Sequence, residues 1–261
     1  MKIYLYFFLL CSYFTTYAQQ SFDDVLEIEI TKDIEELNAL IIKEPKNVEN
    51  YYFRGYRYYE SKQYLDAISD YDTAISLNPK DAKIYFSRGI SNMKLKRFKN
   101  AIEDFTKSIS LNGNLKKSYF NRAYSKSKIN DLNGAISDYS KSIELNPEYV
   151  AAYENRGILK KELHLHKEAI LDFDKAIKIN PKFAEAYQNR AISKAMLNLK
   201  DAINDFDQVV ILSPNDPEGY YNRALYYINF KIKKDYCSDL KKALSLGYLE
   251  SKNIINEKCK K

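Results

Sequence analysis

The residue types that could carry out chemistry are few in this 261-residue chain. Its two histidines, His164 and His166, are two positions apart and would not share one face of a helix. No further ligands stand nearby at metal-binding spacing, so we predict that His166 packs rather than coordinates a metal. The sequence holds no glycine-rich phosphate loop, nucleophile elbow or Ser/His/Asp arrangement. We therefore predict a protein without enzymatic activity or cofactor.

The N-terminus has the features of a secretory signal peptide. Lys2 precedes an apolar run, and Thr16 and Ala18 place small residues where a signal peptidase requires them. We predict cleavage after Ala18, which removes residues 1–18 and exports the protein to the periplasm or out of the cell. The alternative is an uncleaved anchor, but the run is short for a bilayer span of about 20 residues. No later segment is as apolar, so stable membrane insertion is not predicted after cleavage.

The overall charge argues against a nucleic-acid partner. The net charge is +6, but 35 acidic residues are interspersed among 41 basic ones. A nucleic-acid-binding protein would collect its basic residues in a patch or stripe. The excess is too small and too scattered for that. No oligomeric state is predicted.

Small, aromatic and proline residues recur every 33 or 34 positions. Proline ends the units at Pro45, Pro79, Pro147, Pro181 and Pro214, with Gly113 in the missing place. A small residue recurs at Gly55, Gly89, Ala123, Gly157, Ala191 and Ala224. A second small position holds Ala67, Ala101, Ala135, Ala169 and Ala202, and an aromatic follows at Tyr71, Phe105, Tyr139, Phe173 and Phe206. A period of this length is typical of arrays of stacked helical units.

This pattern resembles the tetratricopeptide repeat family, although tyrosine stands at the position where the family usually has tryptophan. The resemblance implies an all-α, right-handed superhelical solenoid of helix–turn–helix units with a capping helix at each end. The six units are 48–81, 82–115, 116–149, 150–183, 184–216 and 217–250, and the caps lie in 19–47 and 251–261. Glycine inside a helix costs about 0.5–1 kcal/mol relative to alanine. We expect Gly157 to face Ala169 and let the two helices of its unit approach closely.

One slot on the first helix of each unit is a candidate for ligand binding. At 100° per residue, the position two before Gly157 points away from the second helix. Four units have asparagine there: Asn121, Asn155, Asn189 and Asn222. The resemblance implies that this direction lines the concave surface, where amides could pair with the backbone of an extended peptide. The alternative is that these asparagines are only solvent-exposed polar residues.

Arginine and aspartate recur together in the six units. The arginines are Arg54, Arg88, Arg122, Arg156, Arg190 and Arg223, and the aspartates are Asp70, Asp104, Asp138, Asp172, Asp205 and Asp239. We predict six partly buried ion pairs with a structural role.

The first three units also supply aromatic and basic residues to the same surface. Phe53, Tyr56 and Tyr124 are predicted to anchor apolar side chains of a ligand, with Tyr52 beside them. The second and third units add Lys83, Lys94, Lys117 and Lys128, whereas later units add Glu154, Glu162, Glu185 and Glu218. Lys83 and Lys117 lead us to predict a partner with an acidic segment.

The end of the chain looks like that of exported bacterial tetratricopeptide repeat proteins. In an oxidising compartment Cys237 and Cys259 could form a disulfide that pins the last helix, and the alternative is two free thiols. The function predicted first is a scaffold that binds an extended segment of a partner protein in a bacterial envelope. Binding of glycan or cell wall through Tyr52 and Tyr56, or a purely structural spacer, are the alternatives.

Overall fold

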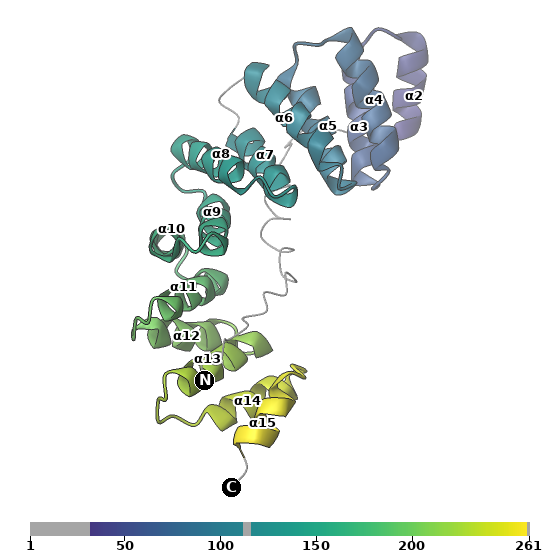
Figure 1. Cartoon of the computed structure of the whole chain (residues 1–261). Coiled ribbons are helices and arrows are strands. Elements are labelled where there is room, and N and C mark those ends of the chain that lie inside the picture. The colour runs from purple at the N-terminus through teal and green to yellow at the C-terminus, as the bar shows by residue number, and fades with distance from the viewer. Residues whose placement is uncertain (1–31, 112–115, 260–261) are drawn as a thin grey trace. The chain divides into compact units, whose positions relative to one another are not determined.

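A computed structural model describes residues 32–111 and 116–259, and the chain forms two compact units, Met1–Ile129 and Asn130–Lys261. Every regular element in these described ranges is an α-helix (Figure 1). The predicted all-α fold of consecutive helical hairpins is confirmed. The predicted signal peptide, residues 1–18, lies outside the described residues. None of the described helices combines the length and the apolar character needed to cross a bilayer.

Unit 1 is built from one preceding helix and the hairpins that follow it. Its helices are α2 (Ile34–Lys43), α3 (Val48–Glu60), α4 (Tyr64–Leu77), α5 (Ala82–Lys94), α6 (Phe98–Leu111) and α7 (Lys116–Lys128). Helices α3 and α4 pack together, as do α5 and α6, and each hairpin packs on the next element along the chain. Helix α2 packs on α3 and buries Leu37 completely.

Unit 2 continues the same pattern and ends in a short helix. Its helices are α8 (Leu132–Leu145), α9 (Val150–Glu162), α10 (His166–Ile179), α11 (Ala184–Met196), α12 (Ala202–Leu212), α13 (Pro217–Asn229), α14 (Tyr236–Ser245) and α15 (Ser251–Lys258). The hairpins are α9–α10, α11–α12 and α13–α14. Gly247, with a φ of +99°, follows α14, and a disulfide joins Cys237 of α14 to Cys259 after α15. The bond fastens the last helix to the last hairpin.

Each hairpin turn contains one residue in the left-handed region of backbone space. These residues have φ between +52° and +65° and are Lys62, Lys96, Asn130, His164, Asn198 and Lys231. They stand at equivalent positions, although the left-handed region favours glycine. His164 is therefore the turn residue of its hairpin. The adjacent His166 begins α10, where burial and the neighbouring His164 lower its pKa. The described residues contain no cluster of potential ligands that could hold a metal ion.

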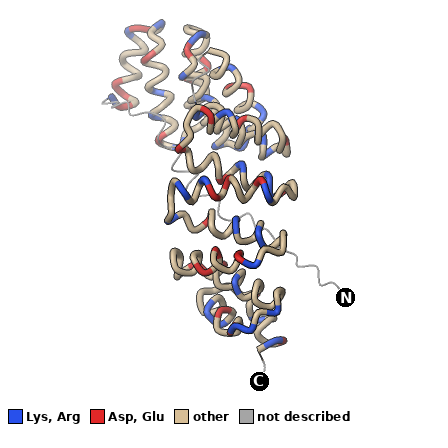
Figure 2. Tube along the Cα trace, turned by 90° about the vertical axis from the view of Figure 1, so that its left-hand side faces the viewer, with Lys and Arg blue, Asp and Glu red and all other residues tan. Residues whose placement is uncertain are grey.

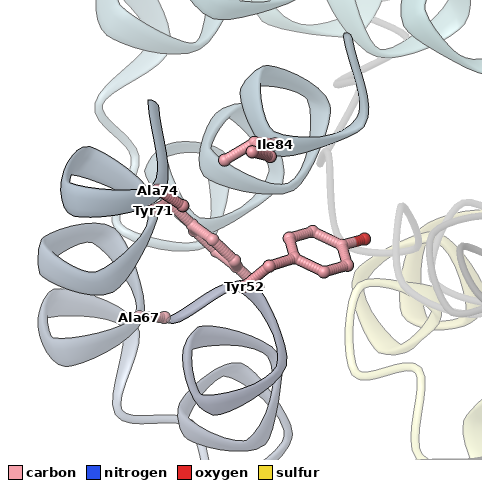
Figure 3. Packing of buried hydrophobic residues seen from close by; sticks show 5 residues of the cluster. All are labelled: Tyr52, Ala67, Tyr71, Ala74 and Ile84. Atoms are coloured by element: carbon pink, nitrogen blue, oxygen red, sulfur yellow. The ribbon is translucent and has the colours of Figure 1, made fainter. Parts of the chain in front are cut away.

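Large aromatic rings fill the space between the helices of a hairpin. Figure 3 shows the cluster of unit 1, in which Tyr52, Ala67, Tyr71 and Ala74 pack with Ile84 of the next hairpin. In unit 2, a Cβ atom on Gly157 would lie 2.7 Å from Cε1 of Phe173. Atoms of the Phe173 ring, rather than of Ala169, are the three nearest to this position. Gly157 is small because the ring of Phe173 occupies the space in front of it.

Candidate functional site

The interior of the hairpins holds a regular set of arginine–carboxylate contacts. In unit 2, Arg156 donates from Nε and Nη2 to the two carboxylate oxygens of Asp172, at 3.0 and 2.6 Å. The equivalent contacts are Arg54–Asp70 and Arg88–Asp104 in unit 1, and Arg190–Asp205 and Arg223–Asp239 in unit 2. These aspartates are 3–6% exposed, so the arginines supply a positive charge to acids that are removed from water. For the sixth pair predicted from the sequence, Arg122 lies in unit 1 and Asp138 lies in unit 2.

The same arginines also reach the preceding hairpin. The Nη1 of Arg156 donates to Ser140 Oγ at 2.9 Å, and that of Arg223 donates to Asp207 at 2.8 Å. In unit 1, Arg122 donates to Thr106 Oγ1 at 3.1 Å. One guanidinium therefore ties together the two helices of its own hairpin and the second helix of the hairpin before it. This arrangement has a structural role.

The four candidate asparagines do not form an open row of amides. Asn121, Asn155 and Asn222 are only 2–7% exposed. The Nδ2 of Asn155 donates to the backbone oxygen of Ala151 at 2.8 Å, while Asn189 is half-buried and accepts from Lys161 Nζ at 2.6 Å. The expectation that these amides face open solvent was wrong for three of the four.

The reason lies in the contact between first helices of neighbouring hairpins. Helix α11 packs on α9, and α5 packs on α3, so each first helix covers part of the one beside it. Ser87 stands at the position that asparagine occupies in the later repeats, and its Oγ lies 3.4 Å from the hydroxyl of Tyr52. A projection of one isolated helix does not include this neighbour. The slot is an interface between hairpins.

The aromatic candidates of unit 1 divide between core and surface. Tyr52 is 7% exposed, belongs to the core cluster, and has a pKa raised to about 12, chiefly by burial. Phe53 packs against the same cluster, with its ring centroid 5.7 Å from that of Tyr52. Tyr56 and Tyr124 are half-buried and lie beside the rings of Tyr59 and Phe98. Tyr52 is therefore a core residue rather than an exposed aromatic side chain.

The two basic candidates are more accessible. The side chain of Lys83 is exposed at the start of α5, and that of Lys117 is half-buried at the start of α7. Figure 2 shows residues of both signs along the helices of each unit, rather than segregated faces of one sign. These two lysines remain candidates for contact with an acidic group.

The clearest set of interacting polar side chains lies on the first helices of unit 2. We call this surface the A-helix face, and it consists of Glu154 and Lys161 on α9, Glu185, Gln188 and Asn189 on α11, and Glu218 on α13. Lys161 is 6% exposed and reaches Asn189. The Nε2 of Gln188 donates to Glu218 Oε1 at 3.0 Å, and Asn222 Nδ2 lies 3.5 Å from the same oxygen. These contacts connect three successive first helices.

Two carboxyl groups of the A-helix face, those of Glu154 and Glu218, are half-buried, whereas that of Glu185 is exposed. Burial, followed by the charge of Glu185, raises the pKa of Glu154 to about 8, while Lys161 acts against the shift. Burial, followed by the charge of Asp216, also raises the pKa of Glu218, against the effects of Asn222, Lys161 and Gln188. Perturbed carboxyl groups that lie close together are typical of functional sites, although structural networks can produce them too.

Sequence reasoning placed acids in these units but did not assign them to a site. The missing signal was the pairing between neighbouring repeats. The fifth residue of one repeat lies beside the second residue of the next repeat, as Gln188 and Glu218 do. A separate hollow of about 470 Å³, lined by Tyr227, Ile228, Lys231, Ile232, Lys233, Lys234, Tyr236 and Lys258, was also missed. It lies beside the turn of the last hairpin and contains none of the predicted residues.

Comparison with protein families places this chain among helical repeat proteins. The family described as "Tetratricopeptide repeat" matches residues 82–115, 116–149 and 150–183, and the family described as "TPR repeat" matches residues 55–96. No curated protein matches the chain.

Solved structures share the fold at low sequence identity. The C-terminal part of a TPR repeat-containing protein from Cytophaga hutchinsonii is 20% identical, with a TM-score of 0.74 over 91% of this chain and 97% of that one. YrrB, described as a TPR protein with an unusual peptide-binding site, is 17% identical, with a TM-score of 0.64 over 77% of this chain and 100% of its own. MamA is 23% identical, with a TM-score of 0.62 over 64% of this chain and 92% of its own. At these identities the likeness shows the fold alone.

Proposed function

The chain belongs to the tetratricopeptide repeat family, and from that premise we propose that it is a non-catalytic scaffold that binds an extended segment of a partner protein. The observation that carries the proposal is the A-helix face, where polar side chains of three successive helices contact one another and stay within reach of solvent. The peptide-binding site named for YrrB shows that this fold can serve such a role in another protein.

Site-specific photo-crosslinking tests which surface meets the partner. A benzophenone amino acid in place of Gln188 on the A-helix face should give a crosslinked adduct in cells of the source organism. Leu171 and Ile211, on second helices and 64% and 65% exposed, are matched control positions. Adducts from the control positions alone would contradict the proposal, and no adduct at any position would favour a structural spacer.

Unit 1 contributes the basic part of the proposed binding surface. We assign Lys83 and Lys117 to an acidic segment of the partner, since both lie at the starts of first helices. Replacing both by alanine should weaken binding of the crosslinked partner at low salt and have little effect at high salt, because salt screens exposed charges. Equal weakening at both salt concentrations would argue against an electrostatic role.

The proposed location is a bacterial envelope, where the protein would take part in assembly or secretion. Two features support it: the predicted signal peptide, and the disulfide between Cys237 and Cys259, a bond that persists in oxidising compartments. Determination of the N-terminal residue of protein from the native organism should give Gln19. An N-terminus at Met1 in a cytosolic fraction would contradict export.

The glycan-binding alternative depended on exposed rings at Tyr52 and Tyr56. Tyr52 instead packs in the core of unit 1, and its hydroxyl lies beside Ser87. No contact on the structure favours that function over protein binding.

A further inference from the structure

The turn of the last hairpin is longer than the turns before it. Three residues join the two helices at 61–63, 95–97 and 163–165, whereas six residues, 230–235, join α13 to α14. The difference begins at Tyr236, which stands where earlier repeats have an alanine. Those alanines are completely buried and are Ala67, Ala101, Ala135, Ala169 and Ala202. A tyrosine ring is too large for that space, so α14 begins later and the residues before it remain in the turn.

The hollow of about 470 Å³ beside this turn is lined by two kinds of residue. Tyr227 is buried, and Ile232 and Tyr236 are half-buried and pack against the core cluster that includes it, with half-buried Ile228 beside them. The lysines that line the hollow are exposed and are Lys231, Lys233, Lys234 and Lys258. Among the described residues, none that lines the hollow is acidic. The hollow therefore suits a ligand that combines apolar side chains with negative charges.

The acids closest to this turn already have partners of their own. Asp235 is the N-cap of α14 and accepts a hydrogen bond from the backbone N–H of Ser238 at 3.1 Å. Asp207 and Asp239 both accept hydrogen bonds from Arg223, at 2.7–2.8 Å. The chain therefore uses these acids for folding.

Three of the four lysines keep their charge available. Lys258 pairs with Glu257 at 3.2 Å. Among the residues that the structure describes, no ion pair involves Lys231, Lys233 or Lys234. Several ammonium groups around one hollow attract an anion, and a ligand with more than one negative charge matches them best.

The disulfide holds two walls of the hollow together. Tyr236 precedes Cys237, and Lys258 precedes Cys259, so the bond joins the chain segments that carry these two lining residues. The hydroxyl of Tyr236 also donates to the backbone oxygen of Lys258 at 3.4 Å. The walls are thus fixed before a ligand arrives, which lowers the entropic cost of binding.

One segment of the chain has the complementary chemistry. Residues 22–30 read FDDVLEIEI, with five apolar residues, four acids and no lysine or arginine. Outside residues 21–31, no stretch of nine residues without lysine or arginine contains more than three acids. The segment lies outside the described residues and follows the predicted cleavage site, so the mature protein contains it. Every copy of the chain therefore carries both the basic hollow and an acidic, apolar segment.

We propose that segment 22–30 of one copy of the chain binds the hollow at the end of unit 2 of a second copy. Its carboxylates contact the exposed lysines, and its apolar side chains pack on Ile228, Ile232 and the tyrosine rings. A phosphate ion would match the lysines alone and leave the apolar residues without a partner. Since the segment and the hollow are different surfaces, the contact is heterologous and links copies in series. This self-association goes beyond the scaffold function proposed above and does not depend on it.

Sedimentation velocity of the mature full-length protein tests this association. The wild type should form dimers and longer chains as its concentration rises at low salt. Lys233→Glu/Lys234→Glu should weaken the association about tenfold or more, because it places acids opposite acids. Lys241→Glu/Lys242→Glu makes the same change of charge at exposed positions of α14 that do not line the hollow, and it should associate like the wild type. A wild type that stays monomeric throughout the concentration series, or equal association of the two double variants, would overturn the inference.

A mixture of two variants separates binding from folding. One variant has the four acids of the segment changed to amides, Asp23→Asn, Asp24→Asn, Glu27→Gln and Glu29→Gln, and keeps its hollow. The other, Lys233→Glu/Lys234→Glu, keeps its segment. Each should be a monomer alone, and together they should form a 1:1 dimer that grows no further, which also shows that both are folded. A mixture that stays monomeric would overturn the inference.

A peptide identifies the surface that the segment meets. An acetylated and amidated peptide of residues 20–31 is added to the variant with the amide segment, labelled with ¹³C at its isoleucine methyl groups. NMR signals of Ile228 and Ile232 should shift, and a peptide with the four acids changed to amides should leave them unchanged. Shifts confined to isoleucines away from the hollow would overturn the inference, as would inorganic phosphate that displaces the peptide at equal concentration. The photo-crosslinking experiment at Gln188 reports on the scaffold function independently.

Discussion

The hairpin interiors of unit 2 and its A-helix face handle buried acids in opposite ways. In the interiors, Asp172 lies between Arg156 and Lys160, with nitrogen–oxygen distances of 2.6 and 2.7 Å. On the A-helix face, Glu154 lies beside another acid, and its pKa rises to about 8 because burial and that neighbour favour the neutral form. In the interiors the acids are paired with cations, whereas on the A-helix face the surroundings of Glu154 favour its neutral form.

This difference separates stability from binding. Substitutions in the interiors should lower the free energy of unfolding and leave recognition intact in the folded fraction. Substitutions on the A-helix face should affect recognition more. The substitutions below run from the largest expected effect on stability to the smallest, and a pH profile follows.

Removal of the ring between α9 and α10 should have the largest effect. Phe173 is completely buried and fills the space in front of Gly157. Phe173→Ala should lower the free energy of unfolding by about 3–5 kcal/mol, since it removes a large side chain and leaves a cavity. Denaturant unfolding checks this, with Leu171→Ala, at a 64% exposed position, as the control expected within about 0.5 kcal/mol. Equal losses in both variants would show that the interior is not where stability resides.

Loss of the disulfide should come next. Cys237 and Cys259 close a loop with a sequence separation of 22, for which a bond stabilises by about 3 kcal/mol. The double variant Cys237→Ser/Cys259→Ser should therefore unfold at lower denaturant than the oxidised wild type. Reductant should shift the wild type to the position of the double variant and leave that variant unchanged. A wild type insensitive to complete reduction would contradict a stabilising bond.

Removal of one guanidinium should cost less. Arg156→Ala breaks the contacts to Asp172 and Ser140, but Lys160 still neutralises the aspartate, so we expect a loss of about 2 kcal/mol. Lys141→Ala removes an exposed pair with Glu144 and should change stability by less than about 1 kcal/mol. Thermal unfolding of the two variants distinguishes a buried from an exposed ion pair. A melting temperature of Arg156→Ala equal to that of the wild type would contradict the structural role.

The pH dependence of stability tests the A-helix face rather than the hairpin interiors. The pKa of Glu154 is higher in the folded chain than in the unfolded one, so the folded state holds more protons between about pH 4.5 and pH 8. Its contribution to stability is therefore present at low pH and is lost as the pH rises through 8. Glu154→Gln should remove this decline, so its stability relative to that of the wild type should rise between about pH 4.5 and pH 8. Parallel pH profiles for the two proteins would show that Glu154 ionises normally.

Contacts inside one hairpin could be predicted from the sequence because they recur with the period. The small residue, the facing aromatic and the arginine–aspartate pair appear in nearly every unit, so spacing alone brings them together. Gly157 and Phe173 show the limit of this reasoning, since the period identified both residues but not that the ring supplies the atoms nearest to the glycine.

Contacts between hairpins could not be predicted in the same way. They depend on how one first helix lies against the next, which the projection of a single helix does not contain. Asn155 and Asn222 were expected to be exposed for this reason, although neighbouring helices bury them. Glu154 and Glu185 were visible only as separate acids, because their pairing arises from the packing of α11 on α9.

The central claim is that the A-helix face binds and the hairpin interiors stabilise. It is tested most directly by the yield of the photo-crosslinked adduct at Gln188, compared with the yield at Leu171 and with the yield at Gln188 in an Arg156→Ala background below the melting temperature of that variant. The account predicts an adduct at Gln188 in both backgrounds and none at Leu171. An adduct at Leu171 alone would contradict it.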